Sequence, residues 1–258
     1  MPQDSPEAAS AGYAPLAGYL AERTGRPWQV ATPPSTTALV DALAGGRVHL
    51  ARLGALTYLQ ASDKAAARPV VRVLVGGRDS SHAVIVVPSD SRVHSIAELA
   101  GTTFAFGDIG SAAGPVVAHY ALLVSGVDPR RHLQELPLYA GSDIATLLAV
   151  AGGRASAGAV DEAVLKRQVA QGRPDLSRLR VIWRSDAITT DPWVLSRRVD
   201  PLLATTIQEA LLALQAPGLL PPEASEGFAP ATGADYAALR LMATELGFLS
   251  RPEPTPAR

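Results

Sequence analysis

The sequence predicts an α/β fold with mostly parallel sheets, because short apolar runs rich in β-branched residues alternate with amphipathic segments. Of the 258 residues, 47% are hydrophobic and 18% are charged, which is typical of a globular protein with a sizeable core. The length allows one large domain or two lobes. The net charge is −1 and the acids and bases are interspersed, so nothing indicates a nucleic-acid or membrane-surface partner.

Helix-end signals and apolar runs predict the elements of the first half of the chain. Residues 13–25 form an amphipathic segment that ends at Gly25, where a glycine after the helix is expected. Ser35 or Thr36 caps a helix at 37–44, which two glycines end. A further helix is predicted at 54–61, and strands are predicted at 28–31, 48–53, 68–76 and 83–87.

The same signals continue in the second half. Ser95 and Glu98 form a capping box. Asp200, with a proline directly after it, begins a helix at 200–214. We expect residues 216–232, rich in Pro and Gly, to lie on the surface, and 252–258 to be a disordered tail. The remaining predictions are strands at 103–106, 136–139, 155–160 and 179–183, and helices at 111–125, 143–150, 162–171 and 235–246.

Residues 104–115 are the stretch with the clearest binding chemistry. They predict a strand, a turn rich in Gly and Asp, and the start of a helix at Ser111, Ala112 and Ala113. The first turn of a helix has N–H groups without partners and the positive end of the helix dipole, so it can bind an anion. The alternative is an ordinary strand–helix junction with Ser111 as its N-cap.

Several kinds of site are excluded or disfavoured. The chain has no cysteine, so disulfides, thiolate metal sites and cysteine nucleophiles are excluded. No two histidines have a metal-binding spacing, and we expect no metal and no cofactor. No run is long enough to span a membrane. No signal peptide is visible, so either the protein is cytoplasmic or the front of the natural chain is absent from this sequence.

Catalytic motifs are also missing. The glycines at 107, 110 and 114 do not have dinucleotide-binding spacing, and no nucleophile elbow surrounds Ser111. Asp161 and Glu162 are predicted on a polar, solvated helix face, and His82 beside two serines is predicted to be a loop histidine. These observations favour binding over catalysis, and we expect no enzyme activity.

An ordered series of short motifs covers nearly the whole chain. The motifs are PQDSP (2–6), YAPLAGYL (13–20) with TG (24–25), GGRVHLARLG (45–54) with Tyr58, VHSIAELAG (93–101), FAFGD (104–108) with Ser111 and Gly114, GVDP (126–129), AGAV (157–160), VIWRS (181–185) and GF (227–228) through DY (235–236). Together they resemble the phosphate-, phosphite- and phosphonate-binding proteins of ABC transporters, which have the type II periplasmic-binding-protein fold.

The resemblance implies two α/β lobes with mixed, mostly parallel sheets flanked by helices. Lobe I would comprise residues 1–80 and 186–258, lobe II residues 81–185, and the hinge would lie near 79–83 and 184–187. The family opens with a strand that leads into the motif at 2–6. We therefore expect that first strand and any export signal to be missing from this sequence, through the choice of region or of gene start.

The resemblance also implies a small anion, such as phosphate, phosphite or a phosphonate, bound in the cleft between the lobes. The protein would be a periplasmic or extracytoplasmic monomer whose partner is an ABC-transporter permease or a membrane sensor. The candidate ligand-binding residues are Ser35, Thr36, Tyr58, Ser81, His82, Gly110, Ser111, Ala112, Ala113, Ser142 and Ser156.

The candidate pocket departs from the family pattern. A Ser-Thr-Ser run of the family is Ser111-Ala112-Ala113 here, and Ser142, Ser156, His49 and Ser81 replace a histidine, two aspartates and an aromatic residue. Each lost charged hydrogen bond is worth roughly 1.5–3 kcal/mol. The second hypothesis is therefore a sensory or regulatory module of the same fold with altered or lost oxyanion specificity. The third is an enzyme on this fold, for which only His82 and Asp108 are candidates.

Overall fold

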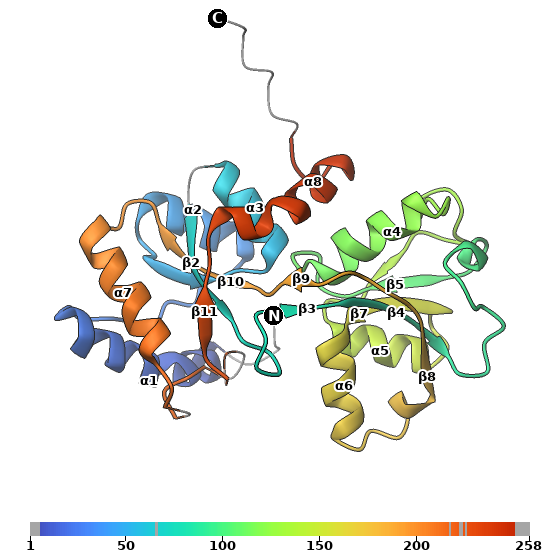
Figure 1. The fold of residues 1–258 in the computed structure, drawn as a ribbon, viewed down its shortest axis with the longest axis horizontal. Coiled ribbons are helices and arrows are strands. Elements are labelled where there is room, and N and C mark those ends of the chain that lie inside the picture. The colour runs from blue at the N-terminus through green and yellow to red at the C-terminus, as the bar shows by residue number, and fades with distance from the viewer. Residues whose placement is uncertain (1–5, 65–66, 217, 222–223, 225, 251–258) are drawn as a thin grey trace, which may run out of the picture.

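The computed structural model describes residues 6–64, 67–216, 218–221, 224 and 226–250, with side chains from residue 10 onward. The chain forms two lobes that lie side by side, each with its own sheet (Figure 1). An antiparallel ribbon of β3 (Ser80–Ser81) and β9 (Ile188–Thr189) runs between them. The second strand of this ribbon lies directly after the predicted hinge at 184–187.

The first lobe is built on a four-stranded sheet. Its strand order is β1 (Leu50–Arg52), β10 (Pro192–Ser196), β2 (Ala67–Val73) and β11 (Phe228–Pro230). Its helices are α1 (Pro6–Thr24), α2 (Thr36–Gly45), α3 (Ala55–Asp63), α7 (Pro201–Ala213), η5 (Gly233–Tyr236) and α8 (Ala237–Glu245).

The second lobe is built on a five-stranded sheet. Its strand order is β6 (Leu138–Tyr139), β5 (Phe104–Phe106), β7 (Ala157–Asp161), β4 (Ala83–Pro88) and β8 (Leu179–Arg184). Its helices are η1 (Ala97–Leu99), η2 (Ala113–Ala118), α4 (His119–Val124), α5 (Asp143–Ala151), α6 (Glu162–Ala170) and η3 (Leu176–Arg178).

The predicted α/β fold with mixed sheets flanked by helices is confirmed, but the prediction that the strands are mostly parallel is wrong. Among the described strands, only the pairings of β5 with β6 and with β7 are parallel. The chain leaves the first lobe through β2 and β3 and returns through β9 and β10, so the strands that join the ribbon run in opposite directions. This crossing makes β2 antiparallel to β10 and β4 antiparallel to β8.

Three local predictions also need correction. Residues 28–31 form no strand, and the Trp28 indole instead donates a hydrogen bond to Thr24 Oγ1 at 3.0 Å. The sequence analysis did not predict β10, although it pairs on both sides and is buried throughout. It also missed β11, which lies inside the segment predicted as surface loop. The predicted tail at 252–258 lies outside the described residues.

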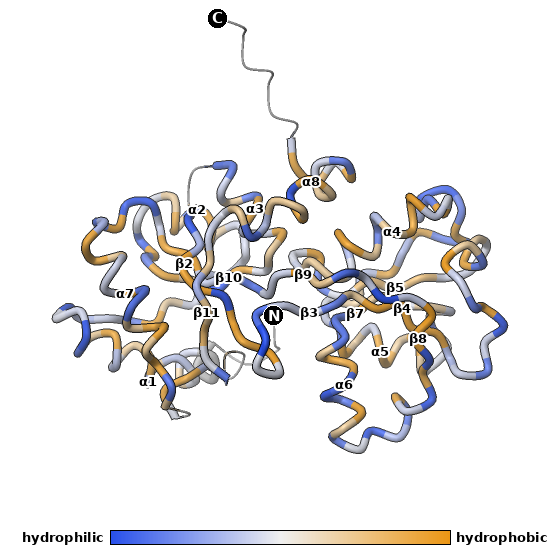
Figure 2. Tube along the Cα trace, viewed as in Figure 1, coloured by the Kyte–Doolittle hydropathy of each residue, from blue (hydrophilic) through white to orange (hydrophobic). Residues whose placement is uncertain are grey.

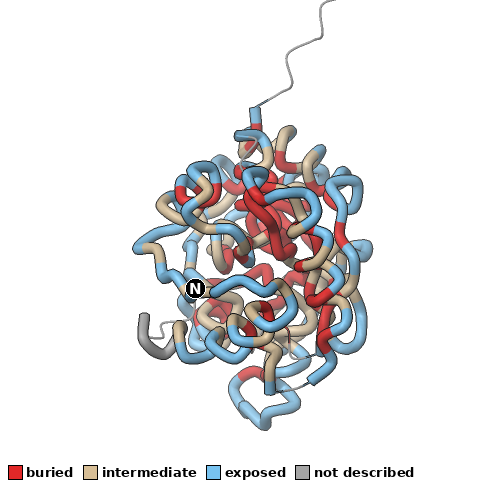
Figure 3. Tube along the Cα trace, turned by 90° about the vertical axis from the view of Figure 1, so that its left-hand side faces the viewer, coloured by how far each residue is buried: buried red, intermediate tan, exposed pale blue. Residues whose placement is uncertain are grey.

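Buried apolar side chains form the cores of both lobes, and one cluster extends across the boundary between them. Val116 and Val117 of the second lobe share that cluster with Leu56 of α3 and Leu239 of α8. Apolar residues are concentrated in the strands, while polar residues are common in the loops (Figure 2). Seen from the first lobe, buried residues occupy the interior and exposed residues the periphery (Figure 3).

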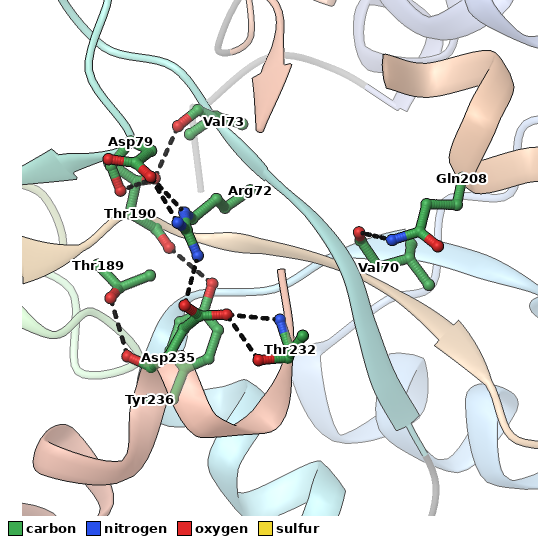
Figure 4. A network of polar contacts seen from close by, with 10 residues as sticks. All are labelled: Val70, Arg72, Val73, Asp79, Thr189, Thr190, Gln208, Thr232, Asp235 and Tyr236. Carbon is green, nitrogen blue, oxygen red and sulfur yellow. Dashed lines mark hydrogen bonds and ion pairs between the residues drawn. The ribbon is translucent and has the colours of Figure 1, made fainter. Parts of the chain in front are cut away.

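A polar network fixes the ribbon to the first lobe (Figure 4). Arg72 of β2 forms ion pairs with Asp79, just before β3, and with Asp235 of η5. The Thr190 hydroxyl, just after β9, donates to the Val73 carbonyl at 2.7 Å, and the Tyr236 hydroxyl donates to the Thr190 carbonyl at 2.9 Å. The ribbon is therefore anchored at both of its strands.

Candidate binding cleft

A cleft of about 2260 Å³ lies between the lobes and extends over the first lobe beside β1. Its second-lobe wall comes from the segments that follow the carboxyl ends of β5, β6 and β7, which is where ligands bind in many open α/β sheets. Its first-lobe wall includes β1, the start of α3, and Asp191 between β9 and β10.

The turn after β5 opens the helix at the cleft. Asp108 Oδ1 accepts the Gly110 N–H at 2.8 Å, and its carbonyl accepts the Ser111 N–H at 3.0 Å, so the turn folds on itself. Ala112 and Ala113 line the cleft, and their N–H groups have no hydrogen bond within the described part of the chain. The buried Ser111 Oγ also lacks a partner there.

The helix begins with the π-helical turn η2, in which the Val117 N–H donates to the Ala112 carbonyl at 2.9 Å. A π-helical turn leaves more N–H groups unpaired at its start than an α-helical one, because each bond reaches back five residues. The opening of this helix therefore offers donors to an anion.

The start of α3 meets this turn from the opposite lobe. The N–H groups of Leu56 and Thr57 donate to the Gly110 carbonyl at 3.2 and 3.4 Å. The Ala55 N–H donates to Asp191 Oδ1 at 3.1 Å, while Asp191 Oδ2 pairs with the Arg52 guanidinium at 2.7 Å. The first three N–H groups of α3 are therefore bound by protein groups and are not available to a ligand.

Three carboxyl groups on the cleft wall have shifted pKa values. Burial and the nearby carboxylates of Asp161, Asp191 and Asp108 raise the pKa of Asp143 to about 7. Burial also raises the pKa values of Asp161 and Asp191. Asp161 Oδ1 accepts the Ser81 hydroxyl at 2.7 Å, and Asp143 Oδ2 accepts the Asp161 N–H at 3.1 Å. These three acids and Asp108 share the cleft lining with four arginines.

Seven of the predicted binding residues line the cleft: Thr36, Ser81, Gly110, Ser111, Ala112, Ala113 and Ser142. Two of their hydroxyls have partners within the protein. Ser142 Oγ caps α5 by accepting the Ala145 N–H at 3.1 Å, and Ser81 bonds to Asp161.

Four predicted binding residues lie off the cleft wall. Ser35 Oγ caps α2, and Tyr58 is buried in the core against Tyr236, with ring centroids 4.9 Å apart. The ring of His82 bonds to the Ser185 carbonyl at 2.9 Å. Ser156 precedes β7 and bonds to Thr103, at the end of the strand opposite the cleft. Because β5 and β7 are parallel, both have their carboxyl ends at the cleft, and Ser156 lies at the opposite, amino end of β7.

The sequence analysis named Asp108 only as a candidate for an enzyme on this fold, and it did not expect Asp143, Asp161, Asp191 or Arg52 at the cleft. The prediction that Asp161 is solvated is wrong, because it caps α6 at the cleft end of β7 and is largely buried. Its position directly after an apolar strand was the signal for a cleft residue. Glu162 does pair at the surface, with Arg184 and Lys166, which lowers its pKa to about 2.

Within the described residues, no group of three or more His, Cys, Asp or Glu side chains is arranged to hold a metal ion. None of the described helices combines the length and apolarity needed to cross a membrane.

Comparisons with known proteins agree with this architecture. The chain is 24% identical to the phosphate-import protein PhnD of Mycolicibacterium smegmatis, over 93% of this chain and 82% of that protein. PhnD1 of Prochlorococcus marinus, solved in complex with methylphosphonate, superposes with a TM-score of 0.81 at 18% identity, covering 96% of this chain and 97% of that one. A Xanthomonas citri protein solved with a chloride ion superposes with a TM-score of 0.81 at 20% identity, covering 95% of each chain.

The structural neighbours show the fold of a two-lobed periplasmic binding protein. A sequence model of the family described as "ABC transporter, phosphonate, periplasmic substrate-binding protein" matches residues 1–236. With that match, an inter-lobe cleft and a ribbon joining the lobes, the chain belongs to the periplasmic substrate-binding proteins of phosphonate ABC transporters.

Proposed function

We propose that this protein captures a small oxyanion of the phosphate, phosphite or phosphonate type in the cleft for an ABC transporter. The observation that carries the proposal is the set of donors at the helix opening, where the N–H groups of Ala112 and Ala113 and the Ser111 hydroxyl have no partner among the described residues. The positive end of the helix favours negative charge at this point. The relative named for phosphate import and the neighbour solved with methylphosphonate support this ligand class.

Ser111, Ala112 and Ala113 are the primary contacts in this proposal, with Thr36 approaching from the other lobe. Gly110 shapes the turn rather than donating, because its N–H is bound to Asp108 and its carbonyl to α3. The lobes comprise residues 1–80 with 186–258 and residues 81–185, and the β3–β9 ribbon joins them.

The protein acts as a binding component and not as an enzyme in this proposal. It works as a monomer outside the cytoplasm and delivers its ligand to a membrane permease. Family membership favours this transport role over a sensory one.

The test is calorimetric titration of the protein and of Ser111→Ala with methylphosphonate, phosphite and phosphate. We expect the wild type to bind at least one of them and Ser111→Ala to bind it about tenfold or more weakly, since a hydrogen bond to a charged group is worth roughly 1.5–3 kcal/mol. The free variant should be as stable as the wild type, because the hydroxyl has no hydrogen bond to lose within the described part of the chain.

The matched control is Ser177→Ala, which removes an exposed hydroxyl that donates to the Pro174 carbonyl in the second lobe. It should leave affinity unchanged. Absence of binding by the wild type, or equal affinities of Ser111→Ala and wild type, would reject the proposed site.

A further inference from the structure

A titratable side chain, His119, lies in the apolar contact between the two lobes. It is the first residue of α4 and is 8% exposed. Its ring stacks on Phe106 of the same lobe, with the ring centroids 5.7 Å apart and an angle of 25° between the planes. Phe248 of the first lobe meets the ring edge-on, with centroids 6.1 Å apart and an angle of 79°. An aromatic side chain from each lobe therefore covers His119.

The surroundings of this contact are apolar on both sides. Phe248 packs against the buried cluster in which Val116 and Val117 of the second lobe meet Leu56 of the first. A charged group in such a place loses its water, and this loss is costly unless hydrogen bonds replace it. The charge state of His119 is therefore coupled to the contact between the lobes.

The ring has no acceptor in place for a second proton. The Nδ1 atom of His119 is buried and has no hydrogen-bond partner within the described part of the chain. Protonated histidine donates from both ring nitrogens, so it needs an acceptor at Nδ1. Burial lowers the pKa of His119, and the Pro115 carbonyl and Asp128 favour the charged form without offsetting the burial. The contact fits the neutral ring and not the charged one.

The charged groups around the ring come from both lobes. In the second lobe, Arg130 opposes the charged ring and Asp128 favours it, while β5 and η2 carry no charged residue. In the first lobe, α8 carries Arg240 and Glu245, and Arg240 pairs with Asp63 of α3. Among the described residues, neither lobe places a hydrogen-bonded carboxylate against Nδ1.

Separation of the lobes would remove Phe248 from the ring and return water to it. The pKa of the ring would then move back toward its ordinary value of 6.5. Below that pH, the separated arrangement binds a proton that the joined arrangement excludes. Each pH unit then favours separation by up to about tenfold, until the buried ring itself takes up the proton.

We propose that His119 is a pH-sensitive switch that holds the lobes together while its ring is neutral and lets them separate when the ring is protonated. Acidification therefore opens the cleft, and neutral pH keeps it closed. This switch goes beyond the proposed function, because it acts on the lobes with or without an anion in the cleft.

The test is a distance measurement between the lobes without any anion. The chain has no cysteine, so Ser177→Cys in the second lobe and Thr205→Cys in the first, both exposed, accept a pair of fluorescent labels. Energy transfer between the labels is compared at about pH 7.5 and about pH 5.0, on either side of the ordinary histidine pKa. The ratio of separated to joined molecules should rise by about fivefold or more at the lower pH, against a limit of about thirtyfold for one and a half pH units.

His119→Phe in the labelled protein keeps an aromatic ring in the contact but carries no proton. It should give the same distance at both pH values. Because the cleft acids, including Asp143, are unchanged in this variant, their titration cannot account for a difference from the wild type. The matched control is His94→Gln, which removes an exposed histidine outside the contact and should behave as the wild type.

Proton NMR of the unlabelled wild type is a second measurement that does not depend on the folding of a variant. One of the five histidine rings should titrate below the ordinary pKa of 6.5, in the pH range where the longer distance appears. Equal responses of the wild type and His119→Phe, or an unchanged distance in the wild type at about pH 5.0, would overturn the switch. Either result leaves the proposed anion site in place.

Discussion

Asp143 is a cleft residue whose pKa departs far from its ordinary value. Its pKa is raised from 3.8 to about 7, first by burial and then by the carboxylates of Asp161, Asp191 and Asp108. Its partner is the N–H of Asp161 at 3.1 Å, which favours the charged form but does not offset the burial. Between these two pKa values, the folded state binds a proton that the unfolded chain releases.

This difference predicts that stability falls as the pH rises from about 4 to about 7 and levels off above. The full effect is at most about 4 kcal/mol, at roughly 1.4 kcal/mol per pH unit between the two pKa values. Asp143→Asn removes this titrating group and should make the curve less steep in this window. Urea unfolding at about pH 5 and about pH 8 measures it. A variant with the slope of the wild type would contradict the assignment to Asp143.

At the scale of elements, the contact between α3 and the turn after β5 depends on two glycines. A Cβ on Gly54 would lie 2.5 Å from the Gly110 carbonyl oxygen, and a Cβ on Gly110 would lie 2.6 Å from Thr57 Oγ1. The first clash is with main-chain atoms, so a side chain at Gly54 cannot be accommodated by a rotamer change.

Gly54→Ala should therefore push α3 away from the turn and break the hydrogen bonds from Leu56 and Thr57 to Gly110. We expect methylphosphonate affinity to fall about tenfold or more, because small displacements of binding groups are costly. Gly18→Ala in α1, where nothing lies within 4 Å of the added Cβ, is the control. Hydrogen exchange of the Leu56 and Thr57 amides reports the separation directly. Unchanged protection in Gly54→Ala would show that the contact tolerates a side chain.

At the scale of the molecule, an apolar seam joins the two lobes beside the cleft. Val116 and Val117 pack in one cluster with Leu56 and Leu239 of the first lobe. The ring of His119 in α4 lies edge-on to Phe248, with centroids 6.1 Å apart, and burial lowers the pKa of this histidine. Separating the lobes would expose these side chains to water, which costs free energy in proportion to the apolar area.

We therefore expect the lobes to stay together in solution whether or not an anion is bound. Small-angle X-ray scattering of the protein with and without methylphosphonate should give the same radius of gyration. A larger radius without the anion that contracts on its addition would show that the seam is too weak to hold the lobes.

Most elements were predictable from the sequence because their signals are local. Gly25 ends α1, Ser35 caps α2, and Asp200 caps α7. β10 was not predictable in this way, because Pro192 begins it and its partners β1 and β2 are more than a hundred residues earlier in the chain. The direction of the strands also depended on where the chain crosses between the lobes. The alternation of strands and helices along the sequence does not reveal this crossing.

The sequence by itself determined the class of fold, the strand–turn–helix at residues 104–115, and the ordered motifs that resemble the family, since these depend on spacing along the chain. Only the tertiary structure decided that Asp143, Asp161 and Asp191 face the same cleft as Ser111, and that Tyr58 and Ser156 do not. The physical reason is that burial and charge depend on which segments meet across the two lobes, and these segments come from distant parts of the chain.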